Sequence, residues 1–594
     1  MKKSFRTVGV VGLAVVVSSM VVGGSPASQS GTTTRVSVDS SAGQSNHDSD
    51  DPSISADGRY VAFGSDADNL VAGDTNGQQD VFVHDRVTGV TTRVSVSSAG
   101  VQANNGADGP AISGNGQFVA FISESDNLVA GDTNSVQDIF VHDRDTGVTT
   151  RVSVSTAGAE GNAMSDLPAI SGDGRWVVFE SDASNLLTGD TNGLTDLFVR
   201  DRQTGETLAV SSDPGGGFQG NGRSFRTSNV SNVPSVSFAS DASNLVVGDT
   251  NGVTDIFLSS GCGQCPGLIR VSVSSSGVQA NAACDEISSI STDGRFVAFS
   301  SAADNLVPGD ANGVNDIFVR DLLTEETTRV SVDSLGIEAN GQSLAPYVSA
   351  DGRFVSFTSF ASNLISGDTN NKLDVFVHDR VTQTTIRVSE SSAGGQGDGD
   401  SFLSPISSDG TIIAFVSAST NLVASDTNGF FDVFVNVRNV PGVIPPDSFT
   451  IIRGFLNGGG LSDLVVSDDQ KLDVRAGLTL FLGEPPLQVV VTGTSPVEVP
   501  SELRFKYEAS VNTPGLTQSI QLFNYVTSSY EEVDLSVPGA MDSVVDVVVT
   551  TNPERFVQVG TREMTAKVVY QRVGFTLLWP WSARLDQAVW TIAP

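Results

Sequence analysis

The segment Asp80-Val-Phe-Val-His-Asp-Arg86 recurs along the chain at a nearly constant spacing. Its first residue returns as Asp138, Asp196, Asp255, Asp316, Asp374 and Asp432, and consecutive copies lie 58 to 61 residues apart. A fixed period of this length is typical of repeat architectures, in which each copy is one structural unit. Seven copies of one unit therefore cover residues 32–439, with a period of about 58 residues.

Each unit contains four short segments with the composition of β-strands. In the first unit these are residues 52–55, 60–63, 81–83 and 91–96, which are rich in β-branched or aromatic residues and bounded by turns such as Asp57-Gly58. No stretch with a helical period lies between them. The sequence therefore predicts an all-β fold of stacked four-stranded units.

The two ends of the repeat indicate a closed ring. The fourth-strand sequence Thr33-Thr-Arg-Val-Ser-Val38 occurs once before the first unit, and the seventh unit lacks a fourth strand. Pairing Thr33–Val38 with Asp432–Val437 would remove both open sheet edges, and an open solenoid gives no reason for this offset. We therefore predict a seven-bladed β-propeller closed by an N-terminal strand.

The segment Ile54-Ser-Ala-Asp-Gly-Arg-Tyr-Val-Ala-Phe63, followed by Asp80-Val-Phe-Val83, resembles the WD-like repeat of TolB-type β-propellers. The resemblance covers all seven units, although in the fourth Val230-Ser-Asn-Val-Pro234 replaces the Asp-Gly turn. The turns here lack the Pro of that family, and the loops between the second and third strands are much longer. The resemblance implies the fold and no particular activity, because this architecture serves many functions.

The first 27 residues have the pattern of an export signal. Lys2, Lys3 and Arg6 precede an apolar run from Val8 to Val22, and Ser25-Pro-Ala27 supplies small residues for cleavage. A run of this length is shorter than the roughly 20 residues that a membrane-spanning helix needs. We expect residues 1–27 to be a signal peptide and the protein to be secreted, to the extracellular space or the periplasm.

A second domain is expected over residues 448–594, after a Pro-rich linker at residues 440–447. Its alternating segments predict strands at residues 448–452, 488–491, 503–507, 519–523, 545–550, 564–570 and 588–592. The pattern predicts a jelly-roll-like β-sandwich, and it is similar to galactose-binding-like accessory domains. A sugar platform would expose Trp579, Trp581 or Trp590, but we expect these side chains to pack in the core.

The charge of the chain limits its partners. Its 68 acidic and 33 basic residues give a formal net charge of −35. This balance argues against nucleic acid and anionic membranes, which need basic patches, and it favours cations. We expect a monomer without a membrane span that binds a protein or a carbohydrate.

The loop between the second and third strands of each unit carries an Asp-x-Asn-x-x-x-Asp motif. Calcium is bound by several oxygens from a tight turn, so the motif is a candidate calcium site, with an affinity of about 10⁻⁴–10⁻³ M because a full ligand set is missing. The candidate metal ligands are Asp74, Asn76, Asp80, Asp132, Asn134, Asp138, Asp190, Asn192, Asp196, Asp249, Asn251, Asp255, Asp310, Asn312, Asp316, Asp368, Asn370, Asp374, Asp426, Asn428 and Asp432.

The same motif has a second explanation that needs no metal. Asp and Asn side chains accept hydrogen bonds from backbone amides one or two residues further on, and such Asx-turns can fix a long loop. Gly77 is replaced by Ser135 and Asn371 in other units, and Asn is consistent with a left-handed backbone there. Calcium sites and Asx-turns both remain open at this point.

A second loop motif follows the fourth strand. It reads Gln102-x-Asn104, Glu160-x-Asn162, Gln219-x-Asn221, Gln279-x-Asn281 and Glu338-x-Asn340, with Gln44-x-Asn46 and Gln396-x-Asp398 as variants. In an antiparallel blade these loops and the Asp-rich loops emerge on the same face. Either this face is a polar binding surface, or its amides and carboxylates connect neighbouring blades.

Signals of catalysis are weak. No serine elbow, zinc pattern, phosphate loop or nucleotide fingerprint occurs, so no catalytic or cofactor-binding residue is assigned. His84, His142 and His378 share one position, where other units carry Arg200, Ser259, Arg320 and Asn436. A position that accepts such different side chains is expected to be an exposed strand end.

The chain has three cysteines, Cys262, Cys265 and Cys284. Cys262 and Cys265 lie in one lengthened turn of the fourth unit, and Cys284 lies after the following strand, on the opposite face. We therefore expect a Cys262–Cys265 disulfide that fixes the turn, with Cys284 free.

Two functions follow from these observations. The first is a secreted, non-enzymatic binding or scaffold protein that uses the polar loop face of the propeller, with weak structural calcium sites. The second is an extracellular carbohydrate-active enzyme, a hydrolase or a lyase, on a propeller scaffold. A central cluster of unrepeated carboxylates or aromatics would favour the enzyme, and a near-symmetric face would favour binding.

Overall fold

The structure of the protein is a computed structural model. The described residues are 31–212, 220–225, 230, 235–260, 267–438, 442–444, 448–453, 455–458, 472–475, 485, 487–495, 499–500, 502–511, 516–538, 543–572 and 582–593. Within them the structure is all β, apart from a short 3-10 helix, η2 (Pro553–Phe556). Outside these residues lie the predicted signal peptide, most of the predicted linker, and Gln219, Cys262, Cys265, Trp579 and Trp581.

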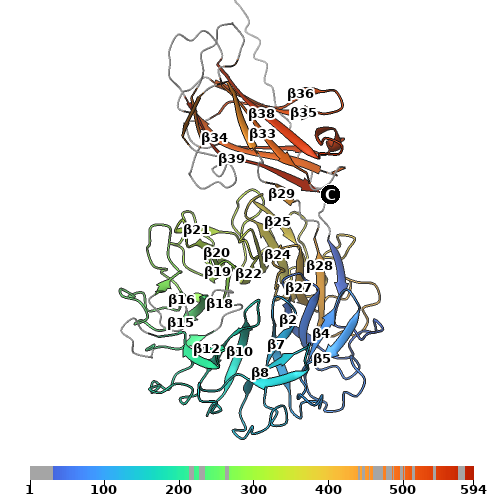
Figure 1. Cartoon of the computed structure of the whole chain (residues 1–594), viewed down its shortest axis with the longest axis vertical. Coiled ribbons are helices and arrows are strands. Elements are labelled where there is room, and N and C mark those ends of the chain that lie inside the picture. The colour runs from blue at the N-terminus through green and yellow to red at the C-terminus, as the bar shows by residue number, and fades with distance from the viewer. Residues whose placement is uncertain are drawn as a thin grey trace, which may run out of the picture.

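Four-stranded antiparallel sheets follow one another around a central axis, so the first part of the molecule is a β-propeller (Figure 1). The first three sheets are β2 (Ser49–Ile54), β3 (Tyr60–Ser65), β4 (Asp80–Asp85) and β5 (Val90–Arg93); β6 (Ala107–Ile112), β7 (Phe118–Ser123), β8 (Asp138–Asp143) and β9 (Val148–Arg151); and β10 (Ser165–Ile170), β11 (Trp176–Ser181), β12 (Asp196–Asp201) and β13 (Glu206–Ala209).

The remaining four-stranded sheets of the described part have the same order. They are β14 (Ser224–Phe225), β15 (Ser235–Ser240), β16 (Asp255–Ser260) and β17 (Gly267–Arg270); β18 (Cys284–Ile290), β19 (Phe296–Ser301), β20 (Asp316–Asp321) and β21 (Glu326–Arg329); β22 (Ser343–Val348), β23 (Phe354–Ser359), β24 (Asp374–Asp379) and β25 (Thr384–Arg387); and β26 (Ser401–Phe402), β27 (Ile412–Ser417) and β28 (Asp432–Val437), joined by β1 (Thr32–Arg35).

The two middle strands of each sheet are buried on both faces. All six residues of β4 are buried, and so are five of the six in β3. This explains why the repeated Val-Phe-Val segments are continuously apolar, whereas the outermost strand β5 alternates between exposed and buried residues. Phe63 and Phe82 face each other across β3 and β4 with ring centroids 5.9 Å apart, and the other six sheets repeat this pair.

The pairing that the sequence predicts for the first strand is confirmed. β1 is antiparallel to β28, with Thr32 opposite Val437 and Arg35 opposite Phe434, and the two lie side by side in Figure 1. The contact continues past the strand, because the Val36 N–H donates to the Val433 carbonyl at 2.8 Å. The N-terminal strand therefore completes the sheet that holds the last repeat.

Neighbouring sheets are held together by an arginine and an aromatic ring. The Arg202 guanidinium lies 4.1 Å from the Phe118 ring centroid in the preceding sheet, and it donates to the Gly174 carbonyl at 2.5 Å. Gly174 has φ +73°, and an added Cβ would lie 2.1 Å from Phe118 Cδ2. The turn glycine thus allows the ring of one sheet to reach the backbone of the next.

Replacing Gly174 by alanine tests this contact. Its left-handed backbone costs an L-residue about 1–2 kcal/mol, and the clash with Phe118 adds about 1–3 kcal/mol. Gly147 is the matched control, since it has φ +72° and open space around it. We expect Gly174→Ala to lower the free energy of unfolding in urea by at least 1 kcal/mol more than Gly147→Ala. Equal losses would contradict the contact.

The C-terminal part contains two further sheets that share one hydrophobic core. The larger has the order β31 (Phe455–Gly458), β32 (Leu472–Arg475), β39 (Ser582–Ala593), β34 (Glu502–Val511) and β37 (Ser543–Val549), with β29 (Gly442–Ile444) also paired to β39. The other has the order β30 (Ser448–Arg453), β33 (Leu487–Thr494), β38 (Glu563–Arg572), β35 (Leu516–Asn524) and β36 (Ser529–Ser536).

All seven strands that the sequence predicts in this part are present, with longer bounds. Strands β29, β31, β32 and β36 were missed, because they are short or lack a clear alternation of buried and exposed residues. Trp590 is fully buried and its ring centroid lies 4.6 Å from that of Phe505, so core packing is confirmed for this tryptophan.

In the described part of the chain, no helix combines the length and the apolar character that crossing a membrane requires.

Candidate cation site beside the central pocket

The Asp-x-Asn-x-x-x-Asp loops hold their carboxylates against an arginine. In the first sheet Arg93 Nη1 lies 3.3 Å from both Asp74 Oδ1 and Asp80 Oδ2, and the three side chains are almost fully buried. Ser95 Oγ also donates to Asp80 Oδ1 at 2.5 Å. The same pairing recurs at Arg35, Arg151, Arg270, Arg329 and Arg387. A cation supplied by the chain itself therefore lies between the two carboxylates in six sheets.

The third sheet differs from the other six. Ala209 occupies the strand position that Arg93 has in the first sheet. Burial raises the pKa of Asp196 in this sheet to about 6. The calcium hypothesis for the loops stays a prediction, and in six sheets the ion would have to displace a guanidinium.

The loop asparagines make the hydrogen bonds of an Asx-turn. Asn76 Oδ1 accepts from the Gln78 N–H at 3.1 Å, and Asn76 Nδ2 donates to the Ala103 carbonyl at 3.1 Å. Equivalent bonds occur at Asn134, Asn192, Asn251, Asn312, Asn370 and Asn428. These contacts favour the explanation that needs no metal.

The second loop motif connects neighbouring sheets. Gln102 Nε2 donates to Asp74 Oδ1 of its own sheet at 2.7 Å. Asn104 Nδ2 donates to Asp126 Oδ1 of the next sheet at 2.7 Å, and Asn127 Nδ2 donates back to the Gln102 carbonyl at 2.8 Å. Of the two roles that the sequence left open, these bonds favour the connection between blades.

The expectation of exposed histidines is wrong. His84, His142 and His378 are 7%, 7% and 1% exposed, and burial lowers the pKa of each. His84 Nδ1 lies 2.9 Å from Thr91 Oγ1 on the adjacent strand. Arg320 takes the equivalent position and donates to the matching hydroxyl of Thr327. Histidine, arginine and asparagine are accepted because each bonds the equivalent threonine, and solvent exposure is not the reason. The fourth sheet differs, since Ser259 lies opposite Leu268.

Cys284 is free and buried at the start of β18, and burial raises the pKa of its thiol to about 12. The Cys262–Cys265 disulfide stays a prediction, because both residues lie outside the described part.

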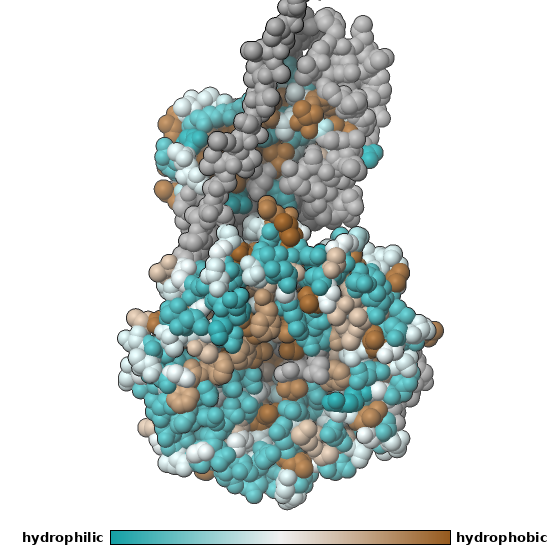
Figure 2. Space-filling view, turned by 180° about the vertical axis from the view of Figure 1, so that it is seen from behind, coloured by the Kyte–Doolittle hydropathy of each residue, from teal (hydrophilic) through white to brown (hydrophobic). Residues whose placement is uncertain are grey.

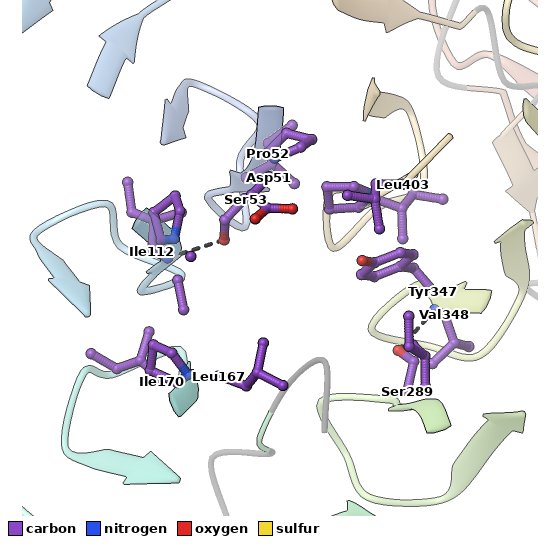
Figure 3. A pocket seen from close by; sticks show the side chains of 18 residues that line it. Asp51, Pro52, Ser53, Ile112, Leu167, Ile170, Ser289, Tyr347, Val348 and Leu403 are labelled. Carbon is purple, nitrogen blue, oxygen red and sulfur yellow. Dashed lines mark hydrogen bonds between the residues drawn. The ribbon is translucent and has the colours of Figure 1, made fainter. Parts of the chain in front are cut away.

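A pocket of about 210 Å³ lies at the centre of the propeller, where the innermost segments of six sheets converge (Figure 3). Its walls are mainly proline and aliphatic side chains, including Pro52, Ile112, Leu167 and Leu403. In the space-filling view the propeller is hollowed at its centre, and apolar residues gather there within a largely hydrophilic surface (Figure 2).

The innermost strands bulge toward this pocket. In β2 the register with β3 shifts between Asp50 and Ser53, and Asp51 has φ +45°. Gly109, Leu167, Ala345 and Leu403 have positive φ at the matching positions. Asp51, Gly109, Leu167 and Leu403 line the pocket, so in the first sheet the residue at this position of the wall is an aspartate.

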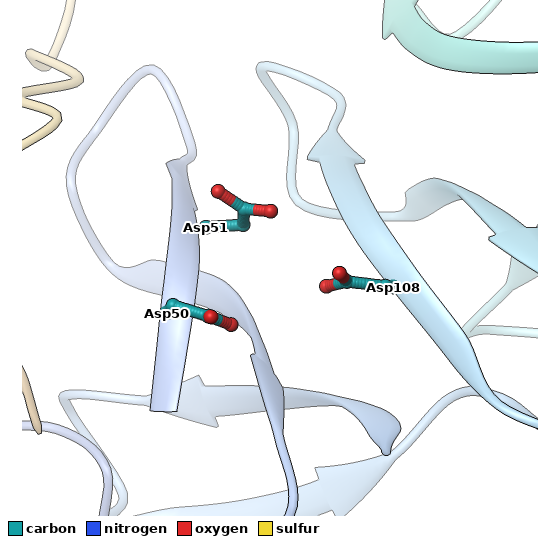
Figure 4. Close-up of side chains that lie close together, drawn as sticks. All are labelled: Asp50, Asp51 and Asp108. Atoms are coloured by element: carbon teal, nitrogen blue, oxygen red, sulfur yellow. The ribbon is translucent and has the colours of Figure 1, made fainter. Parts of the chain in front are cut away.

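Asp51 belongs to a group of three carboxylates. One oxygen each of Asp50, Asp51 and Asp108 lies within 4.8 Å of the other two, and the side chains come from the neighbouring strands β2 and β6 (Figure 4). Asp108 Oδ1 is shielded from solvent and has no hydrogen-bond partner among the described residues. We call Asp50, Asp51 and Asp108 the acidic triad.

Gly64 makes room for the acidic triad. A Cβ at this residue would lie 2.4 Å from Asp108 Oδ1 and 3.1 Å from Asp50 Oδ1. The equivalent positions in the other sheets carry Ile122, Glu180, Ala239, Ser300, Thr358 and Val416. A side chain at residue 64 would therefore clash with the two carboxylates, and only the first sheet lacks one.

The acidic triad retains protons at unusually high pH. Burial, together with the charges of Asp108 and Asp51, raises the pKa of Asp50 to about 7. Burial and the charge of Asp51 raise the pKa of Asp108 to about 6. Ionised, these groups repel one another, and a cation among them would relieve both the repulsion and the cost of burial.

This shift predicts how stability depends on pH. Because the folded pKa values of Asp50 and Asp108 lie above the unfolded value of 3.8, the folded state holds protons that the unfolded state has released. Protonation of Asp50 and Asp108 therefore contributes to the free energy of unfolding. This contribution is fully present below pH 3.8 and is lost as the pH rises through 6 to 7. Melting curves in chelator should show that Asp50→Asn/Asp108→Asn removes part of this decline between pH 4 and 8. An unchanged pH profile would contradict the raised pKa values.

Neither a model of a known protein family nor a curated protein matches the chain. Similar solved structures include an oligogalacturonate lyase in complex with manganese (TM-score 0.40, 14% identity, 65% of this chain and 87% of that chain). A putative TolB from Agrobacterium tumefaciens is also similar (TM-score 0.28, 13% identity, 72% of this chain and 94% of that chain). So are the RRP9 WD40 repeats (TM-score 0.34, 9% identity, 66% of this chain and 94% of that chain).

Proposed function

We propose that the protein is a binding protein whose ligand includes a cation held by the acidic triad at the wall of the central pocket. The observation that carries this proposal is Asp108 Oδ1, a buried carboxylate oxygen without a hydrogen-bond partner among the described residues, beside two further aspartates. A buried charge is costly unless it is paired or coordinates a metal. The simplest occupant is a divalent cation such as calcium, which prefers carboxylate oxygens.

Electrostatics supports this choice of ligand. Three carboxylates within reach of one ion carry up to three negative charges, in a chain whose net charge is −35. In six of the Asp-rich loops a guanidinium already neutralises the carboxylates, as Arg93 does for Asp74 and Asp80. At the acidic triad no salt bridge to Asp50 or Asp108 occurs within the described residues. This contrast favours the triad over the loops as the place where an external cation binds.

Calorimetric titration of the purified protein with calcium and with manganese at pH 7.5 tests the proposal. We expect one site, with a dissociation constant of about 10⁻⁴–10⁻³ M. Asp108→Asn and Gly64→Ala should abolish it, the latter because the new Cβ would occupy the space of Asp108 Oδ1. Asp166→Asn, at the position of Asp50 in the third sheet, is the matched control and should bind normally.

Two outcomes would contradict the proposal. Binding that survives Asp108→Asn would place the cation elsewhere. A stoichiometry of several ions per chain, reduced by Asp74→Asn, would assign calcium to the Asp-x-Asn-x-x-x-Asp loops instead.

An acid–base enzyme is the second candidate function. Asp50 and Asp108 are adjacent carboxyl groups with pKa values raised to about 7 and 6, so near neutral pH one can keep a proton while the other is ionised. Incubation with a library of oligosaccharides, followed by detection of new chain ends, tests this. Turnover that Asp50→Asn abolishes would favour the enzyme over the binding protein.

We further propose the domain organisation of the protein, its location and the class of its partner. The sheets over residues 32–439 would be the seven blades of a closed ring, followed by a linker at residues 440–447 and a jelly-roll-like sandwich over residues 448–594. The export pattern of residues 1–27 supports a secreted monomer, outside the cell or in the periplasm, that binds a protein or a carbohydrate. Mass spectrometry of the secreted protein, with cleavage after Ala27, tests this setting.

A further inference from the structure

We infer that the sixth and seventh sheets bind a neutral carbohydrate through exposed phenylalanines at the end that carries the Asp-x-Asn-x-x-x-Asp loops. This site is separate from the acidic triad, so the inference goes beyond the proposed cation site and does not depend on it. Its basis is a local departure from the repeat, in which apolar side chains occupy positions that are polar in most other sheets.

Large apolar residues replace polar ones at three positions of the repeat. Phe360 follows β23 directly, and its equivalents are acidic in the first four sheets. Leu373 and Phe431 precede β24 and β28, where the first five sheets have glutamine, threonine or asparagine. Leu344 and Phe402 are the second residues of β22 and β26, a position that is aspartate in four sheets. We call these five residues the apolar patch.

The apolar patch is continuous across two sheets that are neighbours in the ring, as β24 and β27 show in Figure 1. The rings of Phe402 and Phe431 meet edge to face, with centroids 5.5 Å apart. The N–H of Ser401, which precedes Phe402, donates to the Leu373 carbonyl of the sixth sheet at 2.7 Å. Backbone and ring contacts therefore hold the patch in one arrangement.

Thr358 shows that the patch has depth. It lies at the position that Gly64 has in the first sheet, where three polar side chains converge on an added Cβ. Their equivalents are Leu344, Leu373 and Phe402, all members of the apolar patch. In these apolar surroundings Thr358 Oγ1 is shielded from solvent and has no hydrogen-bond partner in the described part of the chain.

Two rings of the patch are open to solvent. Phe360 is 54% exposed and Phe431 is 36% exposed, whereas the repeated pair Phe63 and Phe82 is fully buried. Contiguous apolar surface that is bordered by polar residues marks a binding site more often than a single exposed side chain does. The two rings therefore offer a ligand flat apolar faces.

Two carboxylates border these rings. Asp400 Oδ1 accepts from the Leu373 N–H at 3.0 Å, and Asp48 Oδ1 accepts from the Phe431 N–H at 2.8 Å. Asp48 and Asp400 share one position of the repeat, which is not acidic in any of the other five units. The side chain of Asp400 is 49% exposed. Backbone amides of the apolar patch thus hold both carboxylates beside the rings.

A neutral sugar matches this combination. A sugar ring has apolar C–H faces that can pack on an aromatic ring, and hydroxyl groups that donate strong hydrogen bonds to carboxylates. A lipid or an apolar peptide side chain gives the carboxylates no donor. An anionic sugar is disfavoured by the net charge of −35. A cationic partner gains less, because Lys372 Nζ already lies 3.9 Å from Asp400 Oδ2.

Electrophoresis of the purified protein in native gels that contain starch, xylan, galactomannan, β-1,3-glucan or polygalacturonate tests the inference. At least one of the four neutral polysaccharides should retard the protein, and the anionic polygalacturonate should not. Phe360→Ala/Phe431→Ala should weaken the binding about thirtyfold, as truncation of the aromatic anchors of an interface does. Val247→Ala is the control, since Val247 is 96% exposed on the corresponding loop of the fourth sheet and should bind normally.

Further variants separate a sugar platform from a general apolar contact. Phe360→Trp keeps a flat ring and should bind like the wild type, whereas Phe360→Leu keeps only apolar bulk and should bind about tenfold more weakly. Asp400→Asn keeps an oxygen for the Leu373 N–H but loses the charge, so it should weaken binding about fivefold.

Several outcomes would overturn the inference. One is that none of the neutral polysaccharides retards the protein, and another is retardation that Phe360→Ala/Phe431→Ala leaves unchanged. A third is a wild-type dimer that this double variant converts to a monomer in analytical ultracentrifugation, since the patch would then bind a second copy of the chain. The cation site is tested independently, because Phe360→Ala/Phe431→Ala should leave calcium binding unchanged and Asp108→Asn should leave sugar binding unchanged.

Discussion

A chain that lacks residues 1–40 is expected to lose most of the stability of the propeller. The truncation removes β1 from β28, Val36 from a core cluster, and Arg35 from the buried carboxylates Asp426 and Asp432. Burying valine contributes about 1.5–3 kcal/mol, and removing the partner of a buried charge costs about 3–5 kcal/mol. Their sum is comparable with the whole stability of a typical domain, about 5–15 kcal/mol.

Thermal unfolding of the truncated chain measures this loss, with a chain that begins at Gly31 as the control. A synthetic peptide of residues 31–40, added in excess, should restore part of the melting temperature, because it binds only the folded state. Melting at the temperature of the control would show that β1 does not close the ring.

Replacing Arg93 by alanine is expected to have the second largest effect. The change leaves Asp74 and Asp80, which are 3% and 0% exposed, without the guanidinium between them. Removing one partner of a buried ion pair costs about 3–5 kcal/mol, so the free energy of unfolding should fall by this amount. Arg59→Ala is the control, since the Arg59 side chain in its ion pair with Asp85 is 38% exposed and should contribute little.

The Arg93→Ala variant also tests the calcium hypothesis for the loops. With the guanidinium gone, millimolar calcium should raise its melting temperature, and sodium at matched ionic strength should not. Wild-type protein should respond less. An Arg93→Ala variant as stable as the wild type would contradict the buried ion pair.

Much of the propeller follows from the sequence because the same local signals recur. The repeated Asp80-Val-Phe-Val segment is apolar throughout, as a strand buried on both faces must be, and the copy of the fourth strand at Thr33–Val38 has a single place to pair. The loops were ambiguous because their motif suits both a cation and an Asx-turn. The arginine that lies between the two loop carboxylates is visible in the sequence, as Arg93 and its equivalents in the other units. Only the third unit lacks it, because Ala209 stands at that position.

The acidic triad could not be predicted in the same way. Asp50 and Asp108 share one position of the repeat with Asp166 and Asp285, so the repeat does not single them out. The strand that carries Asp50 and Asp51 was expected to begin at Pro52. The proximity of the three side chains depends on a bulge and on the packing of β2 against β6, which are tertiary features. One signal was available, because Gly64 alone lacks a side chain at its position in the repeat.

Anomalous diffraction from crystals soaked in manganese tests the cation site most directly. The account predicts one strong peak within coordination distance of Asp50, Asp51 and Asp108, absent in Gly64→Ala crystals treated identically. A wild-type crystal with manganese only at the Asp-x-Asn-x-x-x-Asp loops, and none at the triad, would contradict it.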